Sequence, residues 1–478
     1  MAENKSAFGE PVHLPVVTEV MTSCAYGVID DRNETFSATG GSADTEDNLF
    51  RCQTGTSIGG YGVIRSKHAI VYHAGQAIRS RLTGMFTAGV PLSLQFAGLF
   101  SLTETLAFGY DGDTFGIIYE SHGRAECREL EVTAAAGGAE SATITFGGDA
   151  ATANLTATTA AGNAFEIARD LNADATLGAK WNFFQNDGHV VAISKSVGPK
   201  SGTYSFSSAT ATATITQQKS GVAKTSNNVP REQWNLNSTY NIDPTKLNIY
   251  EIDYGYLGSS AITFSVYVNA LGHFVPVHRM KARNQTKTNL GNPNLKVGWT
   301  AASLGSSGTN LTVKGASACI QKVSQEHEIE VGARAVESSK SGIDDAALYN
   351  LITIRNRGHY GYLYNLGEIL AVSASINNDA NKAIRVEFLK DATIAGVPNF
   401  TYSNKNDSIL EYDTAGTTVT GGELIDSFLV GATSSENFNI FGVLEPLAPR
   451  ETLTIAVKAV ASGTSAQVDC ALAWKEDK

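Results

Sequence analysis

The chain carries little charge. Only 17% of its 478 residues are Asp, Glu, Lys or Arg, compared with about a quarter in an average globular protein. Acidic residues outnumber basic ones by 47 to 36, the net charge is −11, and no local cluster of Lys and Arg offsets it. Because nucleic-acid binding needs a basic face, the sequence predicts no nucleic-acid partner.

Closely spaced cysteines are also missing. The five cysteines (Cys24, Cys52, Cys127, Cys319 and Cys470) are odd in number and far apart, and no pair has a CxxC spacing. Neither a zinc site nor a disulfide framework is therefore expected. Folding in a reducing cytoplasm is the simplest interpretation.

A long apolar run that would mark a membrane span is hard to find. The start, MAENKSAFGEPVHLP, lacks the basic segment and apolar run of a signal peptide. Residues 82–103 are uncharged and long enough to cross a bilayer. However, Pro91 interrupts them, and Leu92, Leu94 and Phe96 alternate with polar residues as in a half-buried strand. We expect a buried β segment here and no membrane insertion.

Sequence motifs of catalysis are weak or absent. No GxxxxGK[ST] or HExxH motif occurs. Ser57 lies in GTSIG, which matches the G-x-S-x-G nucleophile elbow, but that elbow needs a following helix and both flanks here are strand-like. A turn is the better interpretation of this segment. The sequence predicts no catalytic residue and no enzymatic activity.

Metal ligands are not grouped either. His68 and His73 are five residues apart, as are His273 and His278. Residues an odd number apart face opposite sides of a strand, so neither pair could hold one metal ion from a regular strand. Acidic pairs such as Asp344-Asp345 cannot be assigned to glycoside hydrolysis, because the carboxyl separation depends on the fold. We expect no metal and no cofactor.

What the chain does contain is short alternating segments bounded by turn residues, with 46 Gly and only 11 Pro. Residues 106–120 are expected to form two strands around Asp111-Gly112, and residues 247–280 three strands. Further strands follow residue 335. A spacing of some ten residues per strand predicts a mainly β, multi-domain protein of β-sandwich or jelly-roll architecture.

Residues 129–222 differ, because they are rich in Ala and Thr and contain the best helix candidate. In residues 163–178 the apolar side chains of Phe165, Ile167, Ala168 and Leu171 share one face. Asn163 is the expected N-cap and Gly178 the expected stop. Glu166 is expected on the opposite, polar face. Hairpins are expected before the helix, around Gly147-Gly148, and after it, around residues 186–188.

We therefore expect a small α+β module inserted into a loop of the first sandwich. The predicted domains are residues 1–128 together with 223–335, the inserted module 129–222, and a C-terminal sandwich 336–478. Residues 201–221 would form the last part of the module. In them the alternation of apolar and polar residues shifts by one position across Ser207-Ser208. This shift predicts two separate strands, 202–206 and 209–216, whose small alanine side chains pack against the helix.

Tyr360, Tyr362 and Tyr364 are the candidate binding residues. They recur at steps of two, so one strand face would carry all three rings. Such a ladder would suit contact with a glycan or with another subunit, because aromatic faces stack on sugars and on each other. Core packing or packing between strands is the preferred interpretation of this spacing.

Several β segments resemble poorly characterised structural proteins of tailed phages, marine ones especially, and of large DNA viruses of algae. The resembling segments are SLQFAGLFSLTETLAFGYDGDTFGIIY, DPTKLNIYEIDYGYLGSSAITFSV, NPNLKVGWTAASLGSSGTNLTVKGASA, EYDTAGTTVTGGEL and ALAWKED. The module 129–222 is similar to small β/α modules of phage tail and tail-associated proteins. These families provide no catalytic residues to carry over.

The resemblance implies a virion component, made in the host cytoplasm, that forms part of a fibre, spike, tail appendage or vertex and acts in host attachment or assembly. Its partners would be other virion proteins, copies of itself and a host surface glycan. The sequence does not distinguish a trimer from a pentamer. The alternatives are a capsid protein, a tailspike-type depolymerase that degrades glycans, and a carbohydrate-binding module without catalysis.

Overall fold

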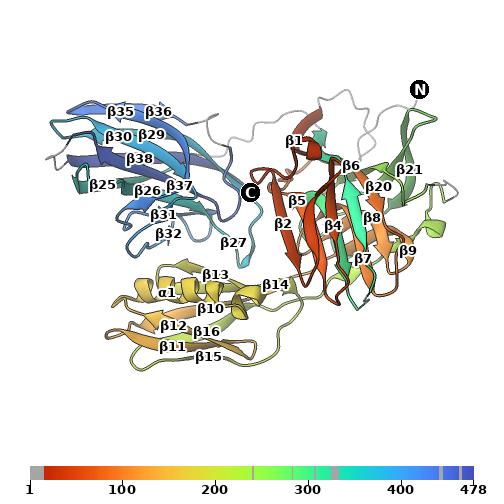
Figure 1. Ribbon diagram of the computed structural model, residues 1–478, viewed down its shortest axis with the longest axis horizontal. Coiled ribbons are helices and arrows are strands. Elements are labelled where there is room, and N and C mark those ends of the chain that lie inside the picture. Colours follow the sequence, from red (N-terminus) through yellow and green to blue (C-terminus); the bar gives the residue numbers. More distant parts are fainter. Residues whose placement is uncertain are drawn as a thin grey trace. The chain divides into compact units, whose positions relative to one another are not determined.

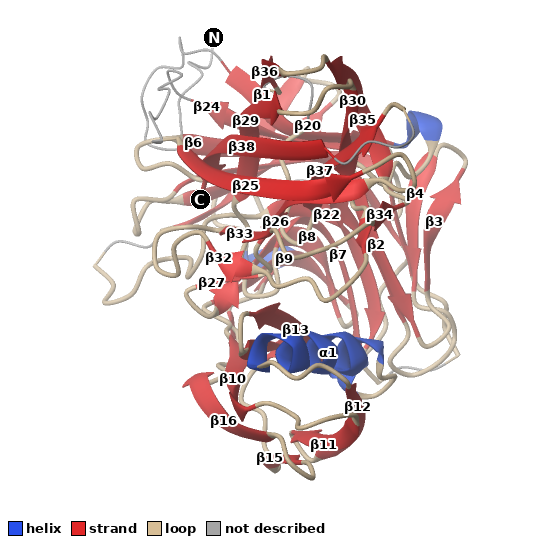
Figure 2. Ribbon diagram, turned by 90° about the vertical axis from the view of Figure 1, so that its left-hand side faces the viewer, coloured by secondary structure: helices blue, strands red, loops and turns tan. Residues whose placement is uncertain are grey.

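The computed structural model describes residues 16–478 except 239–241, 282–283, 306–307, 324–332, 441–444 and 462–465. It is mainly β with antiparallel sheets, and its main helix lies in residues 125–221 (Figures 1 and 2). The predicted fold class is therefore confirmed. The chain divides into two compact units, Met1–Arg124 with Val222–Glu328, and Ala125–Gly221 with Ile329–Lys478. The domain limits expected from the sequence stay a prediction.

The first unit is a sandwich of antiparallel sheets. In one sheet the strand order is β21 (His273–Met280), β20 (Ile262–Val268), β19 (Asn248–Gly255), β6 (Ala77–Phe86), β23 (Thr312–Gly315), β4 (Leu49–Gln53) and β3 (Ser42–Glu46), and β24 (Ser317–Val323) joins β6 to β1 (Val16–Ser23). In the other the order is β17 (Thr225–Ser226), β9 (Thr114–Ser121), β8 (Thr105–Asp111), β7 (Ser93–Phe100), β22 (Lys296–Ser303), β5 (Tyr61–Ser66) and β2 (Asn33–Ala38), with β18 (Val229–Pro230) also on β9. Large aromatic side chains such as Phe108, Tyr250 and Trp299 fill the core.

The uncharged segment 82–103 is buried β structure, as expected. It forms the end of β6 and all of β7, which belong to different sheets. The expected alternation is wrong in detail, because Ser93 and Gln95 are buried while Leu92 lies outside the strand and is exposed. Gln95 is buried because its side-chain amide donates a hydrogen bond to the carbonyl of Thr87. No helix of the described residues is long and apolar enough to cross a membrane.

The inserted module packs one helix against small sheets. The sheets run in the orders β13 (Trp181–Asn186), β14 (His189–Val197), β10 (Ala125–Ala134), β16 (Thr212–Lys219), and β12 (Asp149–Leu155), β11 (Glu140–Phe146), β15 (Tyr204–Ser207). The β11–β12 turn needs positive φ at two consecutive residues, which Gly147 (65°) and Gly148 (92°) supply. The helix α1 (Ala160–Ala173) contacts β12, β13, β10 and β14.

The expected ends of this helix are wrong. The N-cap is Thr159, whose hydroxyl accepts the N–H of Gly162, and α1 ends at Ala173, whereas Gly178 lies in the separate short helix α2 (Leu177–Lys180). Asn163 lies one turn inside α1 and is buried, because its side-chain oxygen accepts the N–H of Ala136 and its amide donates to the carbonyl of Ala157.

Glu166, which the sequence placed on the polar face of the helix, is buried as well. Its carboxylate accepts the backbone N–H groups of Thr156 and Ala157, so a charged residue on the packed face is satisfied by the loop that precedes the helix. Phe165, which was expected on the apolar face, is only half-buried.

The segment 201–221 forms two strands, as expected, with shifted limits. β15 pairs with β11 and β16 pairs with β10, so the chain changes sheets between them. Tyr204 and Phe206 face the module core in the first strand, and Ala213 and Ile215 do so in the second. The shift in the alternation of apolar and polar residues therefore marks a break between two strands. Ala211, just before β16, is buried in the same core as the helix.

The rest of the second unit is the C-terminal sandwich. Its first sheet runs in the order β25 (Arg334–Ile343), β38 (Ala466–Asp477), β29 (Glu368–Asn378), β36 (Ser434–Asn439). The facing sheet runs in the order β32 (Thr401–Tyr402), β33 (Leu410–Asp413), β26 (Tyr349–Asn356), β37 (Thr452–Ala459), β30 (Ile384–Lys390), β35 (Glu423–Val430). Two short pairs, β27 (His359–Tyr360) with β28 (Leu363–Tyr364) and β31 (Thr393–Ile394) with β34 (Val419–Thr420), complete it.

Candidate functional site

The outer face of the β25-β38-β29-β36 sheet is an open polar surface. In β38, Val468, Cys470, Leu472 and Trp474 are buried in the core, so the residues between them point outward. Cross-strand pairing then places outward-facing side chains in rows: one row is Ser339, Asp469, Asn377 and Ser435, and the next is Glu337, Ala471, Ser375 and Asn437. We call these eight residues the polar face.

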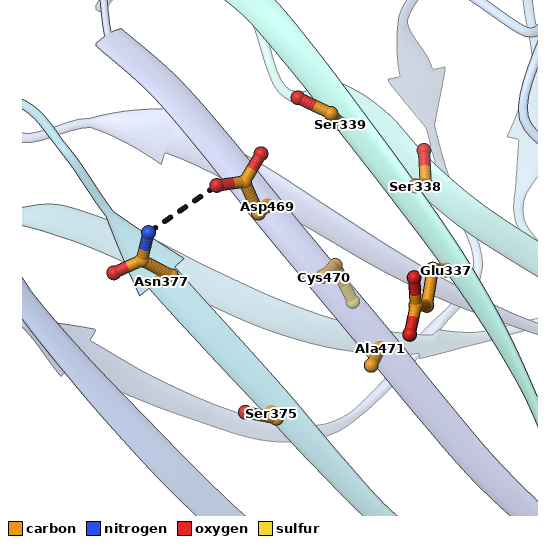
Figure 3. Close-up of a pocket in the computed structure, with 8 residues that line it drawn as sticks. All are labelled: Glu337, Ser338, Ser339, Ser375, Asn377, Asp469, Cys470 and Ala471. Carbon is orange, nitrogen blue, oxygen red and sulfur yellow. Dashed lines mark hydrogen bonds between the residues drawn. The ribbon is translucent and has the colours of Figure 1, made fainter.

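A shallow hollow of about 400 Å³ lies on this polar face, between β25, β38 and β29. Figure 3 shows Asn377 and Asp469 at one end of it, and Glu337 near Ala471 further along the strands. The short side chains of Ser375 and Ala471 leave the space open. At these two positions another molecule can approach the sheet backbone closely.

Hydrogen bonds hold the carboxylate of Asp469 in place. The amide of Asn377 donates to Asp469 Oδ2 over 3.2 Å. Hydrogen bonds from Ser339, Asn377 and Gln467 hold the pKa of Asp469 below its usual value. Asp469 is therefore ionised at neutral pH, and it keeps acceptor capacity toward the solvent.

Cys470 contributes no reactive group to the hollow. It is 3% exposed and, like the other four cysteines of the described chain, forms no disulfide. Burial raises the pKa of its thiol to about 12, so the thiolate nucleophile does not form at neutral pH. The hollow therefore offers hydroxyls, an amide and carboxylates. These groups suit hydrogen bonding to an uncharged polar molecule or to another protein surface.

The three candidate tyrosines do not form a ladder. Tyr360 ends β27 and Tyr364 ends β28, and between them Gly361 (φ 58°) and Tyr362 (φ 63°) make a tight turn. Two consecutive residues with positive φ reverse the chain, so the spacing of two does not continue along one strand. Since Tyr360 pairs with Leu363 and Tyr364 pairs with His359, Tyr360 and Tyr364 lie on opposite faces of the hairpin.

Two of these tyrosines bind the inserted module. The Tyr364 hydroxyl accepts a hydrogen bond from the Asn182 amide over 2.6 Å and donates to the carbonyl of Ser194 over 3.2 Å. The Tyr362 hydroxyl donates to Glu129 Oε2 over 3.2 Å. The Tyr360 hydroxyl instead donates to the carbonyl of Asn406 in the C-terminal sandwich. All three rings are half-buried. Their role in binding a glycan or another subunit stays a prediction.

Further contacts join the module to the sandwich beside this hairpin. The guanidinium of Arg355 lies 2.7 Å from the carboxylate of Glu411 and donates to the carbonyl of Gln185 over 3.0 Å. The amide of Asn186 donates to the same carboxylate over 3.1 Å. Glu411 is only 1% exposed, so its charge is balanced within the protein. We call this set of contacts the junction.

An aromatic cluster lies at the centre of the junction. The ring of Phe184 packs 5.6 Å from that of His359, which stacks on Tyr362. A Cβ atom at Gly358 would lie only 2.0 Å from the ring of Phe184. Burial, followed by the nearby Arg357, lowers the pKa of His359 to about 3, so this histidine is neutral at physiological pH. The sequence alone does not indicate the junction, because the module residues and the sandwich residues that contact each other lie 170 or more positions apart.

The other sequence candidates occupy ordinary positions. Ser57 is exposed in the connection from β4 to β5, and no helix follows it, so the interpretation as a turn is confirmed. On β21, His273 is exposed and His278 is buried. The register shifts between Pro276 and His278, so β21 is not a regular strand here and the odd spacing does not place the two histidines on opposite faces. His68 and His73 lie outside the regular strands. Among the described residues no group of three or more His, Cys, Asp and Glu could hold a metal ion.

Comparison with known proteins gives little. No family model matches the chain, and no curated protein matches it. Among solved structures, a legume lectin-like domain from Entamoeba histolytica matches 60% of this chain and 89% of its own length, with a TM-score of 0.24 and 10% identity. The VP2 subviral particle of infectious bursal disease virus matches 85% of this chain and 83% of its own length, with a TM-score of 0.13 and 10% identity. Scores this low support no argument about fold or function.

Proposed function

We propose that this chain is a structural protein of a virus particle, without enzymatic activity, that forms part of a surface or tail appendage such as a fibre, spike or vertex. It would be made in the host cytoplasm, assemble as a homo-oligomer and contact other virion proteins. The polar face supports this proposal most. It is an open surface of a regular sheet, and the hollow in it is lined in part by short side chains. A sheet of another protein can therefore pack on it at the usual distance between two packed sheets.

The junction supports the same role. Paired charges and hydrogen bonds attach the module to the C-terminal sandwich at Arg355, Glu411 and Tyr364, so the second unit presents a firmly held surface. A preorganised surface loses less conformational entropy on binding than a mobile one. Such surfaces suit proteins that assemble into particles.

The test is the mass of the purified full chain by native mass spectrometry, for the wild type and for Ser375→Arg. Arginine at position 375 would place a long charged side chain in the middle of the hollow. We expect a homo-oligomer of fixed size that Ser375→Arg weakens. The control Ser427→Arg, at an exposed serine of β35, should leave the oligomer unchanged. A monomeric wild type, or equal effects of both variants, would contradict assembly through the polar face.

A carbohydrate-binding role is the second candidate, and the hydrogen-bonding groups of the hollow favour it. Asn377, Asp469 and Ser339 offer donors and acceptors of the kind that sugar hydroxyls satisfy. A glycan array with the wild type and with Ser375→Arg tests this candidate. If the wild type binds a glycan at the hollow, Ser375→Arg should abolish that binding. Release of sugar from host envelope polysaccharide would instead indicate a depolymerase.

A further inference from the structure

Three connections at one end of the first unit contain no charged residue. They are residues 54–60 (TGTSIGG), 87–92 (TAGVPL) and 304–311 (LGSSGTNL). The register places them together: Gln53 pairs with Thr312, Phe86 with Val313, and Ser93 with Ser303. In a chain with net charge −11, these three connections are therefore an uncharged part of the sequence.

Each connection exposes one large aliphatic side chain. Ile58 is 59% exposed, Leu92 is 65% exposed and Leu304 is 64% exposed. We call these three residues the apolar tip. A single exposed leucine is ordinary, but grouped ones indicate an interaction site.

The backbone holds the apolar tip in place. The N–H of Leu304 donates to the carbonyl of Leu92 over 2.9 Å, and the N–H of Gly59 donates to the carbonyl of Ser303 over 3.0 Å. Leu92 has a φ of 58°, a conformation that leucine rarely adopts. These hydrogen bonds fix the backbone at Leu92, at Leu304 and next to Ile58.

We propose that the apolar tip inserts into the interfacial layer of an uncharged lipid bilayer. The three exposed side chains present roughly 350 Å² of apolar surface, less than half of the about 800 Å² that each partner of a stable protein complex buries. The tip is therefore too small to hold a protein partner alone. Shallow insertion of single side chains into a bilayer needs no matching surface, and its strength grows with each buried aliphatic group.

The charges around the apolar tip favour a neutral bilayer. The other connections at this end carry Asp111 and Asp113 in one turn, and Asp243 and Lys246 in another. The balance is negative, so an anionic lipid surface would repel this end. The proposal differs from the sequence expectation of no membrane insertion, because the tip combines loops far apart in the chain. It does not depend on the proposed role in a virus particle.

The test is flotation of the full chain with vesicles of phosphatidylcholine, and with vesicles that also contain phosphatidylserine. Leu92→Asn keeps a residue that tolerates positive φ, and Leu304→Ser removes a second side chain of the tip. Each should reduce partitioning into phosphatidylcholine vesicles about tenfold. The control Leu257→Asn replaces a leucine that is 62% exposed, also has positive φ and follows β19 at the opposite end of the sandwich. It should bind like the wild type.

Circular dichroism and the melting temperature establish that each variant is folded. If Leu92→Asn is unfolded, Leu304→Ser decides. Failure of the wild type to float with phosphatidylcholine vesicles, or the same loss in Leu257→Asn as in the tip variants, would overturn the proposal. So would tip variants that float like the wild type but form a smaller oligomer, since the tip would then be a contact between copies of the chain.

Discussion

Glu104 provides a sharp test of the structure of the first unit. It lies between β7 and β8 and is fully buried. Its Oε1 accepts the backbone N–H groups of His122 (3.2 Å), Gly291 (3.0 Å) and Asn292 (3.3 Å). Its Oε2 has no hydrogen-bond partner among the described residues. Burial raises the pKa of Glu104 from 4.5 to about 7.

This pKa predicts a loss of stability as the pH rises. The fold prefers the neutral carboxylic acid, so the full stability is present below about pH 4.5 and is lost as the pH rises through 7. At about 1.4 kcal/mol for each pH unit, the loss is about 3 kcal/mol. In Glu104→Gln the side chain stays neutral, and its carbonyl oxygen can accept the same three N–H groups. Relative to the wild type, the variant should therefore gain about 3 kcal/mol between pH 4.5 and pH 8.

The assay is urea unfolding at pH 4.5 and pH 8, followed by hydrogen exchange of the amides in β7 and β8, so that only the first unit is measured. Glu232→Gln, at an exposed glutamate of the same unit, is the control and should show no such gain. If Glu104→Gln and the wild type differ by the same amount at both pH values, the pKa of Glu104 is the same in the folded and unfolded states, and the reasoning from burial is refuted.

Two further predictions concern the junction. Gly358→Ala would place a Cβ 2.0 Å from the ring of Phe184 and should destabilise the second unit by about 2 kcal/mol, measured as a lower urea midpoint, whereas Gly138→Ala, with open space around it, should not. Arg355→Met removes the partner of the buried Glu411 and should cost about 3 kcal/mol by the same assay. Adding Glu411→Leu should recover part of that loss, and a double variant as unstable as the single one would contradict the explanation by an unpaired charge.

Local patterns predicted the elements well where turn residues marked them. Gly147-Gly148 and the turn at residues 186–188 located the hairpins of the module, and the phase change at Ser207-Ser208 located the break between β15 and β16. The helix cap was harder, because Thr159 and Asn163 are both good N-cap residues and lie four positions apart. Asn163 instead lies inside the fold, where its side-chain oxygen accepts the N–H of Ala136.

The functional surfaces could not be predicted in the same way. The rings of Tyr360 and Tyr364 share a face only if the strand continues, and the positive φ of Tyr362 that ends it is unusual for a tyrosine. The polar face combines β25, β38, β29 and β36, which lie between residues 334 and 477. Alternation in residues 466–477 shows which side chains share a face, but the neighbouring strands are set by long-range pairing that no local pattern reveals.

Labelling of intact, purified virus particles with an antibody against this chain tests the proposed function most directly. An epitope in the exposed connection at Ile58 belongs to the first unit and includes no residue of the polar face or the junction. The proposal predicts that the antibody binds particles at regular positions, and that mass spectrometry detects the chain in the same preparation in a fixed ratio to the main capsid protein. A chain found only in the soluble fraction of infected cells, and absent from particles, would contradict it.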